Sequence, residues 1–175
     1  MTRKILHHTS MRSTKYGGIE QFIVNLNQQL EDADTQITSQ YETKPSSEAF
    51  CNAVTDSRSE LLTQITQSSP LRSFASSLAL YFKTRPTLVI THFLSSPQYM
   101  AGAVYQLIFP KTQFISVFHL SPGLSKTSIA TRCLNRFTAI IPVSVAVEKK
   151  LLQAGLSPSI IKQRYLGVFL HSERL

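Results

Sequence analysis

The sequence contains few features typical of secreted, membrane-spanning or metal-binding proteins. Its two cysteines, Cys51 and Cys133, lie far apart and have no metal-ligand spacing. We therefore expect free, buried thiols in a reducing compartment. No apolar run approaches the roughly 20 residues that a membrane-spanning helix needs. The first residues also lack the apolar core of a secretion signal. These absences make the cytoplasm the default location.

Acidic residues are absent from a long central segment, from Leu61 to Val147, and the whole chain carries a formal net charge of +8. Such a segment should carry a positive field that favours an anionic lipid, an anionic substrate or nucleic acid. The alternative is that the charge serves solubility alone. Nucleic acid is the least expected partner, because the aromatic and basic motifs of known binding modules are missing. The basic residues of the segment are Arg72, Lys83, Arg85, Lys111, Lys126, Arg132 and Arg136.

Three missing patterns argue against two enzyme classes and against a zinc site. Asp does not occur between Leu61 and the end of the chain, which leaves no plausible Ser-His-Asp set. The dinucleotide fingerprint G-x-G-x-x-G is also missing, and this argues against a dehydrogenase. The histidines lack the short spacings that would raise a zinc site above a small probability. We therefore expect no metal.

Strands and helices are predicted to alternate along the chain. With 42% hydrophobic and 16% charged residues, the composition fits a globular protein, and residues 1–175 are expected to form a single domain. Ser96 is the expected N-cap of one helix, and Ser144 that of another, which Gly155 closes. A Ser-, Thr- and Gln-rich region predicts less clearly a short strand over 49–54 and a short helix over 58–67. The other predicted strands cover 4–9, 35–41, 87–92, 113–119, 138–143 and 162–168, and the other helices cover 19–30, 71–82, 97–109, 127–137 and 145–154.

This alternation predicts a Rossmann-like α/β fold, a parallel sheet with helices on both faces. Ligands of such sheets bind beyond the carboxyl ends of the strands. Three histidines and one serine lie at the carboxyl ends of predicted strands, and a glycine pair precedes the first helix, whose bare N–H groups suit an anion. Each has a plainer interpretation: a turn for the glycines, a cap for the serine and, for His92, a buried ring bonded to a backbone carbonyl. The candidate site residues are Gly17, Gly18, His8, His92, His119 and Ser144.

The order of the motifs resembles the N-terminal domain of the family-4 glycosyltransferases, enzymes of the GT-B fold. The resemblance covers nearly the whole chain. The matching segments are Gly17-Gly18-Ile19-Glu20 with Asn25-Leu26 and Leu30, the strands that end in His92 and His119, the run 140–144, Gly155, and Tyr165-Leu166-Gly167-Val168.

The resemblance implies a two-domain enzyme that transfers a sugar from a nucleotide-sugar donor to an acceptor. Such enzymes usually act with retention and without a metal, so no cofactor is expected beside the donor as co-substrate. The N-terminal domain mainly holds the sugar or lipid-linked acceptor. Gly17 and Gly18 would face the donor's diphosphate, and His119 would lie beside the transferred sugar as the catalytic candidate. His8, His92 and Ser144 are left as acceptor-side candidates.

The chain departs from the family in lacking the C-terminal donor-binding domain, with its basic residues and its E-x7-E element. Asp34-Thr35 also stands where the family tends to have Gly-His. We therefore expect half of an enzyme that is inactive alone and needs the missing domain or a partner chain. A non-catalytic subunit of a split glycosyltransferase and half of a sugar-nucleotide epimerase are the alternatives. The basic helix predicted within 71–85 could rest on the inner face of an anionic membrane or simply pack on the sheet.

Overall fold

The computed structural model describes residues 3–9, 18–30, 35–41, 59–63, 69–92, 94–120 and 123–162. Apart from β2 and β3, which follow each other among the described elements, parallel strands alternate with helices as the sequence predicted. In chain order the elements are β1 (Arg3–Thr9), α1 (Gly18–Leu30), β2 (Thr35–Tyr41), β3 (Ser59–Thr63), α3 (Pro70–Thr84), β4 (Leu88–His92), α4 (Ser96–Ile108), β5 (Gln113–Phe118), α5 (Ile129–Leu134), β6 (Ala139–Pro142) and α6 (Val145–Gln153).

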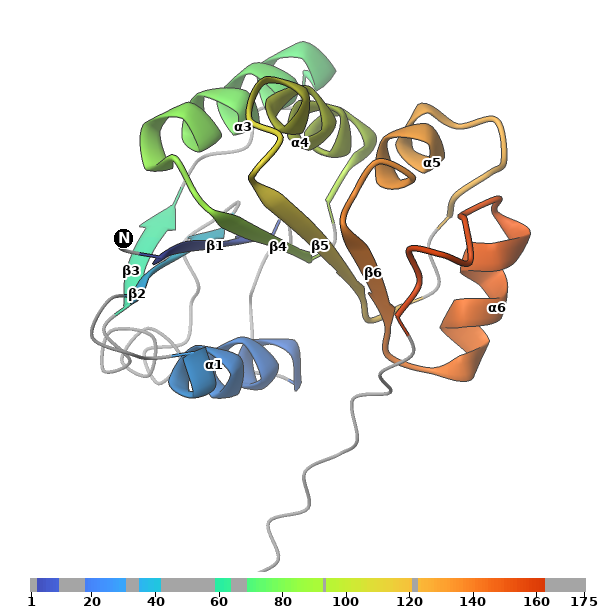
Figure 1. Cartoon of the computed structure of the whole chain (residues 1–175), viewed down its shortest axis with the longest axis horizontal. Coiled ribbons are helices and arrows are strands. Elements are labelled where there is room, and N and C mark those ends of the chain that lie inside the picture. The colour runs from blue at the N-terminus through green and yellow to red at the C-terminus, as the bar shows by residue number, and fades with distance from the viewer. Residues whose placement is uncertain are drawn as a thin grey trace, which may run out of the picture.

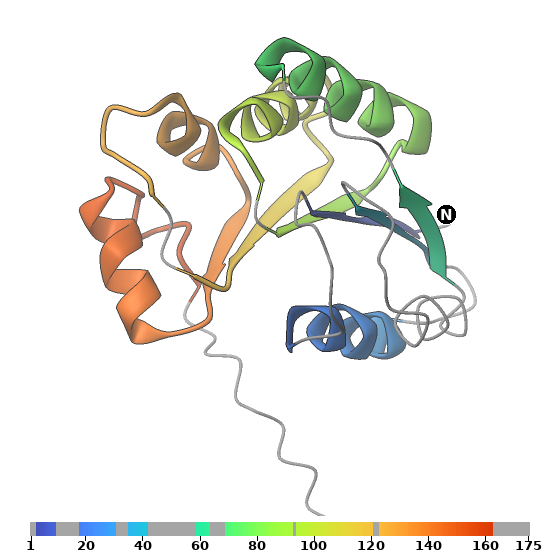
Figure 2. The ribbon, with the colours of Figure 1, turned by 180° about the vertical axis from the view of Figure 1, so that it is seen from behind.

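The described strands form one sheet in the order β3-β2-β1-β4-β5-β6, and every pair is parallel. Helix α1 covers one face of the sheet, and α3 and α4 lie together on the other (Figure 1). The view from behind shows the same layers, with α5 and α6 beside β6 (Figure 2). This arrangement confirms the predicted Rossmann-like α/β fold with helices on both faces.

Each face of the sheet has its own apolar core, because successive side chains of a strand point to opposite faces. On the α1 face, Ile5, Ile37, Ile90 and Val117 pack with the predicted helical stripe of Phe22, Leu26 and Leu30. The larger core lies under α3, α4 and α5. Its fully buried members include Tyr81, Tyr105, Phe114, Leu134 and Ile140.

Two helix ends test the capping predictions. The N-cap of α4 is Ser95, one residue before the predicted Ser96, and its capping box with Gln98 fixes that register. The N-cap of α6 is Ser144, as predicted. Its Oγ accepts a hydrogen bond of 3.3 Å from the backbone N–H of Val147. Gly155 follows α6 at φ +85°, a conformation that favours glycine.

One predicted helix is wrong. Residues 58–67 were expected to be helical, whereas Ser59–Thr63 is the strand β3, paired in parallel with β2 from Ile37↔Ser59 to Tyr41↔Thr63. Pairing along a free strand edge outweighs a weak local preference for helix. Helix α5 is also shorter than predicted, at Ile129–Leu134.

Several other predictions lie wholly or partly outside the described residues: the strand over 49–54, the strand after residue 162, and Cys51. Of the last predicted strand, only Lys162 is described. Its N–H donates to the carbonyl of Ile140, and the preceding Ile161 forms an isolated bridge with Ile140. Cys133 is a buried free thiol. Among the described residues, no helix is both long and apolar enough to cross a membrane.

The contact between α4 and the sheet depends on a glycine. A Cβ at Gly102 would lie 2.9 Å from Cε1 of Phe114 and 3.2 Å from Cζ of Phe137, both of them buried rings. We expect Gly102→Ala to lower the free energy of unfolding by about 1–2 kcal/mol. The overpacking cost of about 1–3 kcal/mol exceeds the gain in helix propensity of at most about 1 kcal/mol.

Chemical denaturation followed by circular dichroism measures this change. Gly123→Ala is the matched control, since nothing lies within 4 Å of a Cβ at that exposed position. Equal stability of the two variants would show that the aromatic rings yield without cost.

Candidate functional site

The candidate site lies where the strand order reverses. From β1 the chain builds outward through β2 and β3 on one side, and from β4 through β5 and β6 on the other. In open α/β sheets the crevice for a ligand forms at this switch point, beyond the carboxyl ends of the strands. Thr9, the last residue of β1, pairs with His92, the last residue of β4, and His119 directly follows β5.

The alternation of β1 decides which histidines meet. His7 shares the α1 face with His92 and His119, whereas His8 points to the opposite face, where its Nδ1 lies 2.8 Å from the hydroxyl of Tyr81 on α3. The sequence interpretation grouped His8 with His92 and His119 and overlooked His7. The period of two could have separated them, because His7 follows Ile5, a core residue of the α1 face.

The three histidines of the α1 face form a chain of ring contacts across β1, β4 and β5. Nδ1 of His7 lies 3.3 Å from Nε2 of His92, and Nδ1 of His92 lies 3.1 Å from Nε2 of His119. The ring centroids are 5.6 and 5.4 Å apart. Each centroid separation nearly equals the nitrogen–nitrogen distance plus the distance from centroid to nitrogen in each of the two rings. The rings therefore meet edge to edge, as N–H···N hydrogen bonds require, rather than face to face.

Burial keeps these imidazoles neutral. His7 and His92 are fully buried, and desolvation lowers the pKa of His7 from 6.5 to about 4 and that of His92 well below 6.5. Desolvation also lowers the pKa of His119 to about 4, although nearby Glu20 acts in the opposite direction. On the other face, burial lowers the pKa of His8 to about 4 and raises that of Tyr81. The imidazoles of His7, His8, His92 and His119 should therefore be uncharged near pH 7.

Helix α1 covers the histidine chain. The ring of Phe22 meets those of His92 and His119 edge-on, with centroids 6.0 and 5.5 Å apart. Glu20, in the first turn of α1, is only 3% exposed and attracts positive charge on His119. The amino end of α1 therefore carries both an apolar cover and a carboxylate to the edge of the sheet.

The remaining predicted site residues take different places. Gly18 is the first residue of α1, while Gly17 lies outside the described residues. Ser144 follows β6, and its hydroxyl oxygen caps α6. Within the part of the chain that the structure describes, no group of three or more His, Cys, Asp or Glu side chains could hold a metal ion.

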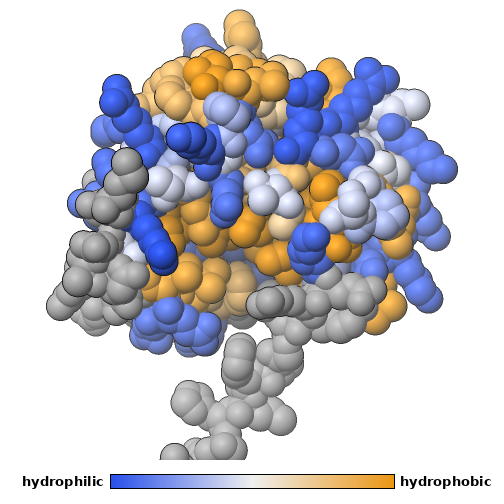
Figure 3. Space-filling model, viewed as in Figure 1, coloured by the Kyte–Doolittle hydropathy of each residue, from blue (hydrophilic) through white to orange (hydrophobic). Residues whose placement is uncertain are grey.

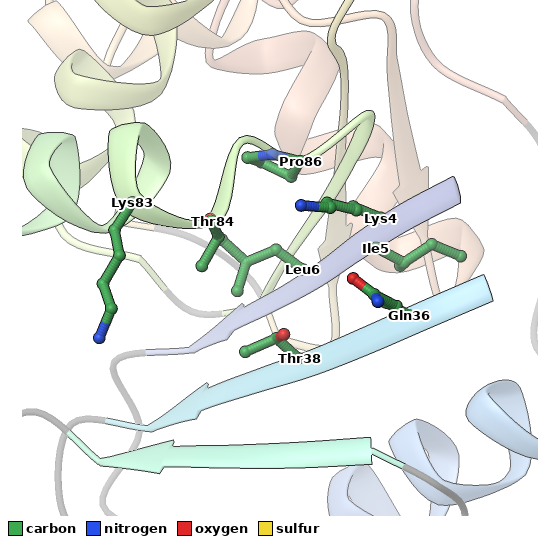
Figure 4. Close-up of a pocket in the computed structure, with 8 residues that line it drawn as sticks. All are labelled: Lys4, Ile5, Leu6, Gln36, Thr38, Lys83, Thr84 and Pro86. Carbon is green, nitrogen blue, oxygen red and sulfur yellow. The ribbon is translucent and has the colours of Figure 1, made fainter. Parts of the chain in front are cut away.

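A hollow of about 200 Å³ lies apart from the histidine chain, toward the amino ends of β1 and β2 on the α3 face (Figure 4). Its rim carries lysine, threonine and glutamine side chains. Ligands of α/β sheets bind at the opposite edge, so we do not assign the candidate site to this hollow. It is lined by Lys4, Ile5, Leu6, Gln36, Thr38, Lys83, Thr84 and Pro86.

The buried histidines should make stability depend on pH. Their pKa values in the folded protein lie below the ordinary value of 6.5, so the unfolded chain takes up protons first as the pH falls. The contribution of the buried, neutral histidines to the free energy of unfolding is complete above about pH 6.5. It is lost progressively as the pH falls toward about 4. We expect each fully buried histidine to remove roughly 1–2 kcal/mol from the free energy of unfolding between pH 7 and pH 5.

Denaturation at several pH values measures this loss. His8→Asn keeps a polar atom near the position of Nδ1 for Tyr81 but cannot titrate, so its loss between pH 7 and pH 5 should be smaller by about 1–2 kcal/mol. The same loss in the wild type and the variant would mean that His8 does not contribute.

Comparison with known proteins places the fold. No protein-family model and no curated protein matches the sequence. The solved structure of a glycosyltransferase from Rickettsia africae matches with a TM-score of 0.64 at 15% identity, over 92% of this chain and 42% of that one. The apo form of the lipopolysaccharide outer core galactosyltransferase WaaB matches with a TM-score of 0.62 at 14% identity, over 91% and 44%.

A third match is the UDP-GlcNAc 2-epimerase from Neisseria meningitidis bound to UDP-GlcNAc. Its TM-score is 0.53 at 11% identity, over 90% of this chain and 44% of that one. This chain therefore spans less than half the length of these three proteins. At such low identities the similarity shows the fold alone. The fold they share with this chain is a Rossmann-like α/β domain.

Proposed function

We propose that this chain is the acceptor-side, N-terminal half of a nucleotide-sugar-dependent, retaining glycosyltransferase related to family 4. The observation that carries the proposal is the position of His119. His119 lies at the carboxyl edge of the sheet, near the amino end of α1. Its ring contacts His92, which lies at the switch point between β1 and β4. The fold supports the proposal, because transferases of more than twice the length share it.

In this proposal the donor is brought by a second domain or a partner chain. Gly17 and Gly18 would approach its diphosphate, because the first N–H groups of α1 suit an anion. The nucleotide sugar is a co-substrate, and the proposal requires no metal or other cofactor. An isolated half would bind a sugar or lipid-linked acceptor weakly and would not catalyse, because transfer depends on holding both substrates together.

The geometry suggests how the other candidates would act. His92 is fully buried and touches His119, so it would act through that ring rather than on an acceptor. His8 is bonded to Tyr81 and would shape the α3 side of the edge. The hydroxyl of Ser144 is engaged in capping α6, at the end of β6 where an acceptor would enter.

The first alternative is half of a sugar-nucleotide epimerase. The similarity to a 2-epimerase bound to UDP-GlcNAc favours it, since the covered share of that protein is the same 44% as for WaaB. The second alternative is a non-catalytic subunit that recruits the acceptor to a separate donor-binding chain.

The reading frame and a product assay distinguish these three functions. We expect the full polypeptide encoded by the gene, or a co-purifying chain, to supply a second Rossmann-like domain. With UDP-sugars and an acceptor, NMR should show a new glycosidic bond of retained configuration. A changed sugar in an intact nucleotide sugar would indicate the epimerase. Absence of any donor-binding domain or partner would contradict the enzyme proposal for this polypeptide.

Replacing His119 tests its catalytic role in the complete enzyme. His119→Ala should lower kcat by roughly 10- to 100-fold, the usual effect of losing one hydrogen bond to a developing charge. Its free energy of unfolding should fall by only about 1–3 kcal/mol, the cost of leaving Nδ1 of the buried His92 without its partner. Thr87→Ala is the control, since Thr87 bonds Lys4 at the opposite edge of the sheet. Near-normal turnover of His119→Ala would remove His119 from the catalytic set.

We also propose a weak peripheral contact with the inner face of an anionic membrane, through α3 and α4. The helix stripe expected to rest on lipid is partly occupied by the core, since Tyr81 is buried and Phe74 and Leu78 pack against the same core. Apart from Leu71 at the amino end of α3, the exposed large apolar residues of the two helices instead gather at their carboxyl ends. This apolar tip consists of Phe82, Leu107, Ile108 and Phe109, which are 42%, 64%, 53% and 38% exposed.

Contacts and charge make the tip a suitable membrane surface. The ring centroids of Phe82 and Phe109 lie 5.8 Å apart, so the carboxyl ends of the two helices are in contact. Lys83, Arg85 and Lys111 are exposed beside them. Figure 3 shows apolar surface over α3 and α4 with hydrophilic side chains around it. Apolar burial and basic charge together favour an anionic lipid surface.

Sedimentation with vesicles of phosphatidylcholine and phosphatidylglycerol tests the tip. We expect binding at low salt that weakens at high salt. Leu107→Asn should lower the partition coefficient by roughly 10- to 100-fold, because a buried leucine contributes about 1.5–3 kcal/mol. Ile129→Asn, at a 59% exposed position on α5, is the matched control and should bind normally. No binding at low salt would refute the proposal.

A further inference from the structure

We propose that His7 and His92 are positioning residues that hold the proton of His119 on Nδ1, the ring nitrogen that does not contact His92. The evidence is the chain of edge-to-edge contacts, 3.3 and 3.1 Å long, that runs from a fully buried position on β1 to the edge of the sheet. One further observation gives the chain a direction. Nε2 of His7 is buried and has no hydrogen-bond partner among the described residues.

Counting protons leaves two arrangements of the chain. A neutral imidazole has one N–H and one acceptor nitrogen, and each contact needs one donor and one acceptor. In the first arrangement all three rings carry the proton on Nδ1, so that His7 donates to His92 and His92 donates to His119. In the second all three carry it on Nε2, and both bonds run in reverse. The tautomer of His119 is therefore tied to that of His7 through His92.

The buried end of the chain favours the first arrangement. There, Nε2 of His7 is an unused acceptor, whereas in the second it is an N–H without a partner. Orphaned N–H groups in protein interiors are rarer than under-used acceptors. At the other end, Glu20 attracts positive charge on His119, whose Nε2 already faces His92. A proton on Nδ1 leaves that contact intact, with Nε2 of His119 as the acceptor.

The same coupling resists protonation of His119. A second proton on His119 must enter at Nε2, which turns His92 into an acceptor and leaves His7 with a buried, unpartnered N–H. Of the titratable groups around the chain, His7, His119 and His8 disfavour positive charge on His92, whereas Glu20 favours it on His119. His119 thus stays neutral and donates from Nδ1. Resting on the proposed function, this makes His119 a hydrogen-bond donor to an oxygen of the sugar or phosphate, not an acid.

Imidazole NMR of the ¹⁵N-labelled protein tests the assignment directly at pH 7. Long-range ¹H–¹⁵N correlations should show Nδ1 protonated and Nε2 bare in His7, His92 and His119, with nitrogen–nitrogen couplings across both contacts. A proton on Nε2 of His119, or a mixture of tautomers, would overturn the proposal. This spectrum of the unmodified protein decides the question even where a variant does not fold.

A variant tests the coupling itself. His92→Asn places an amide where Nδ1 contacts His119 but removes the link to His7. The amide oxygen can then accept from protonated His119, so the pKa of His119 should rise by about one unit or more. His8→Asn, on the opposite face, is the matched control and should leave that pKa in place. An unchanged pKa in His92→Asn would refute the coupling.

These outcomes are independent of the transferase assay. An Nε2 tautomer would remove the positioning role and leave the proposed function standing. A protein without transferase activity would leave the tautomers as measured.

Discussion

The parallel pairing of β1 with β4 is the constraint on which the rest of the structure depends. The paired residues of the two strands are 83 positions apart in sequence, and their register sets Thr9 beside His92. This pairing fixes the strand order and with it the point at which the order reverses. It also brings the carboxyl ends of β1, β4 and β5 to one edge. The chain of histidine contacts follows from that alignment and from the alternation of side chains.

Burying the imidazoles of His7 and His92 beside Ile90 and Val117 is an unusual use of core positions. A buried polar group costs free energy unless it is hydrogen-bonded, and here each inner ring contacts the next. The arrangement remains incomplete at Nε2 of His7. An apolar side chain at position 7 would avoid that unsatisfied atom. The presence of a histidine at position 7 therefore indicates that the three histidines serve the site at the edge of the sheet rather than the stability of the fold.

The charge distribution and the fold separate two surfaces of the molecule. The histidine chain and the amino end of α1 lie at the carboxyl edge of the strands. The apolar tip with Phe82 and Phe109 lies at the carboxyl ends of α3 and α4, which precede β4 and β5 and therefore lie toward the other edge. A membrane bound at the tip would leave the histidine edge open to a second domain.

Apolar periodicity and caps such as Ser144 are local signals, so the fold class and most of the elements could be predicted from the sequence. It failed at β3, where pairing with β2 outweighed the local pattern, and at His7. Local spacing places His7 and His8 side by side, yet only the sheet decides which one faces α1. The meeting of His7, His92 and His119 was decided by tertiary structure alone, since their contacts join residues 85 and 27 positions apart.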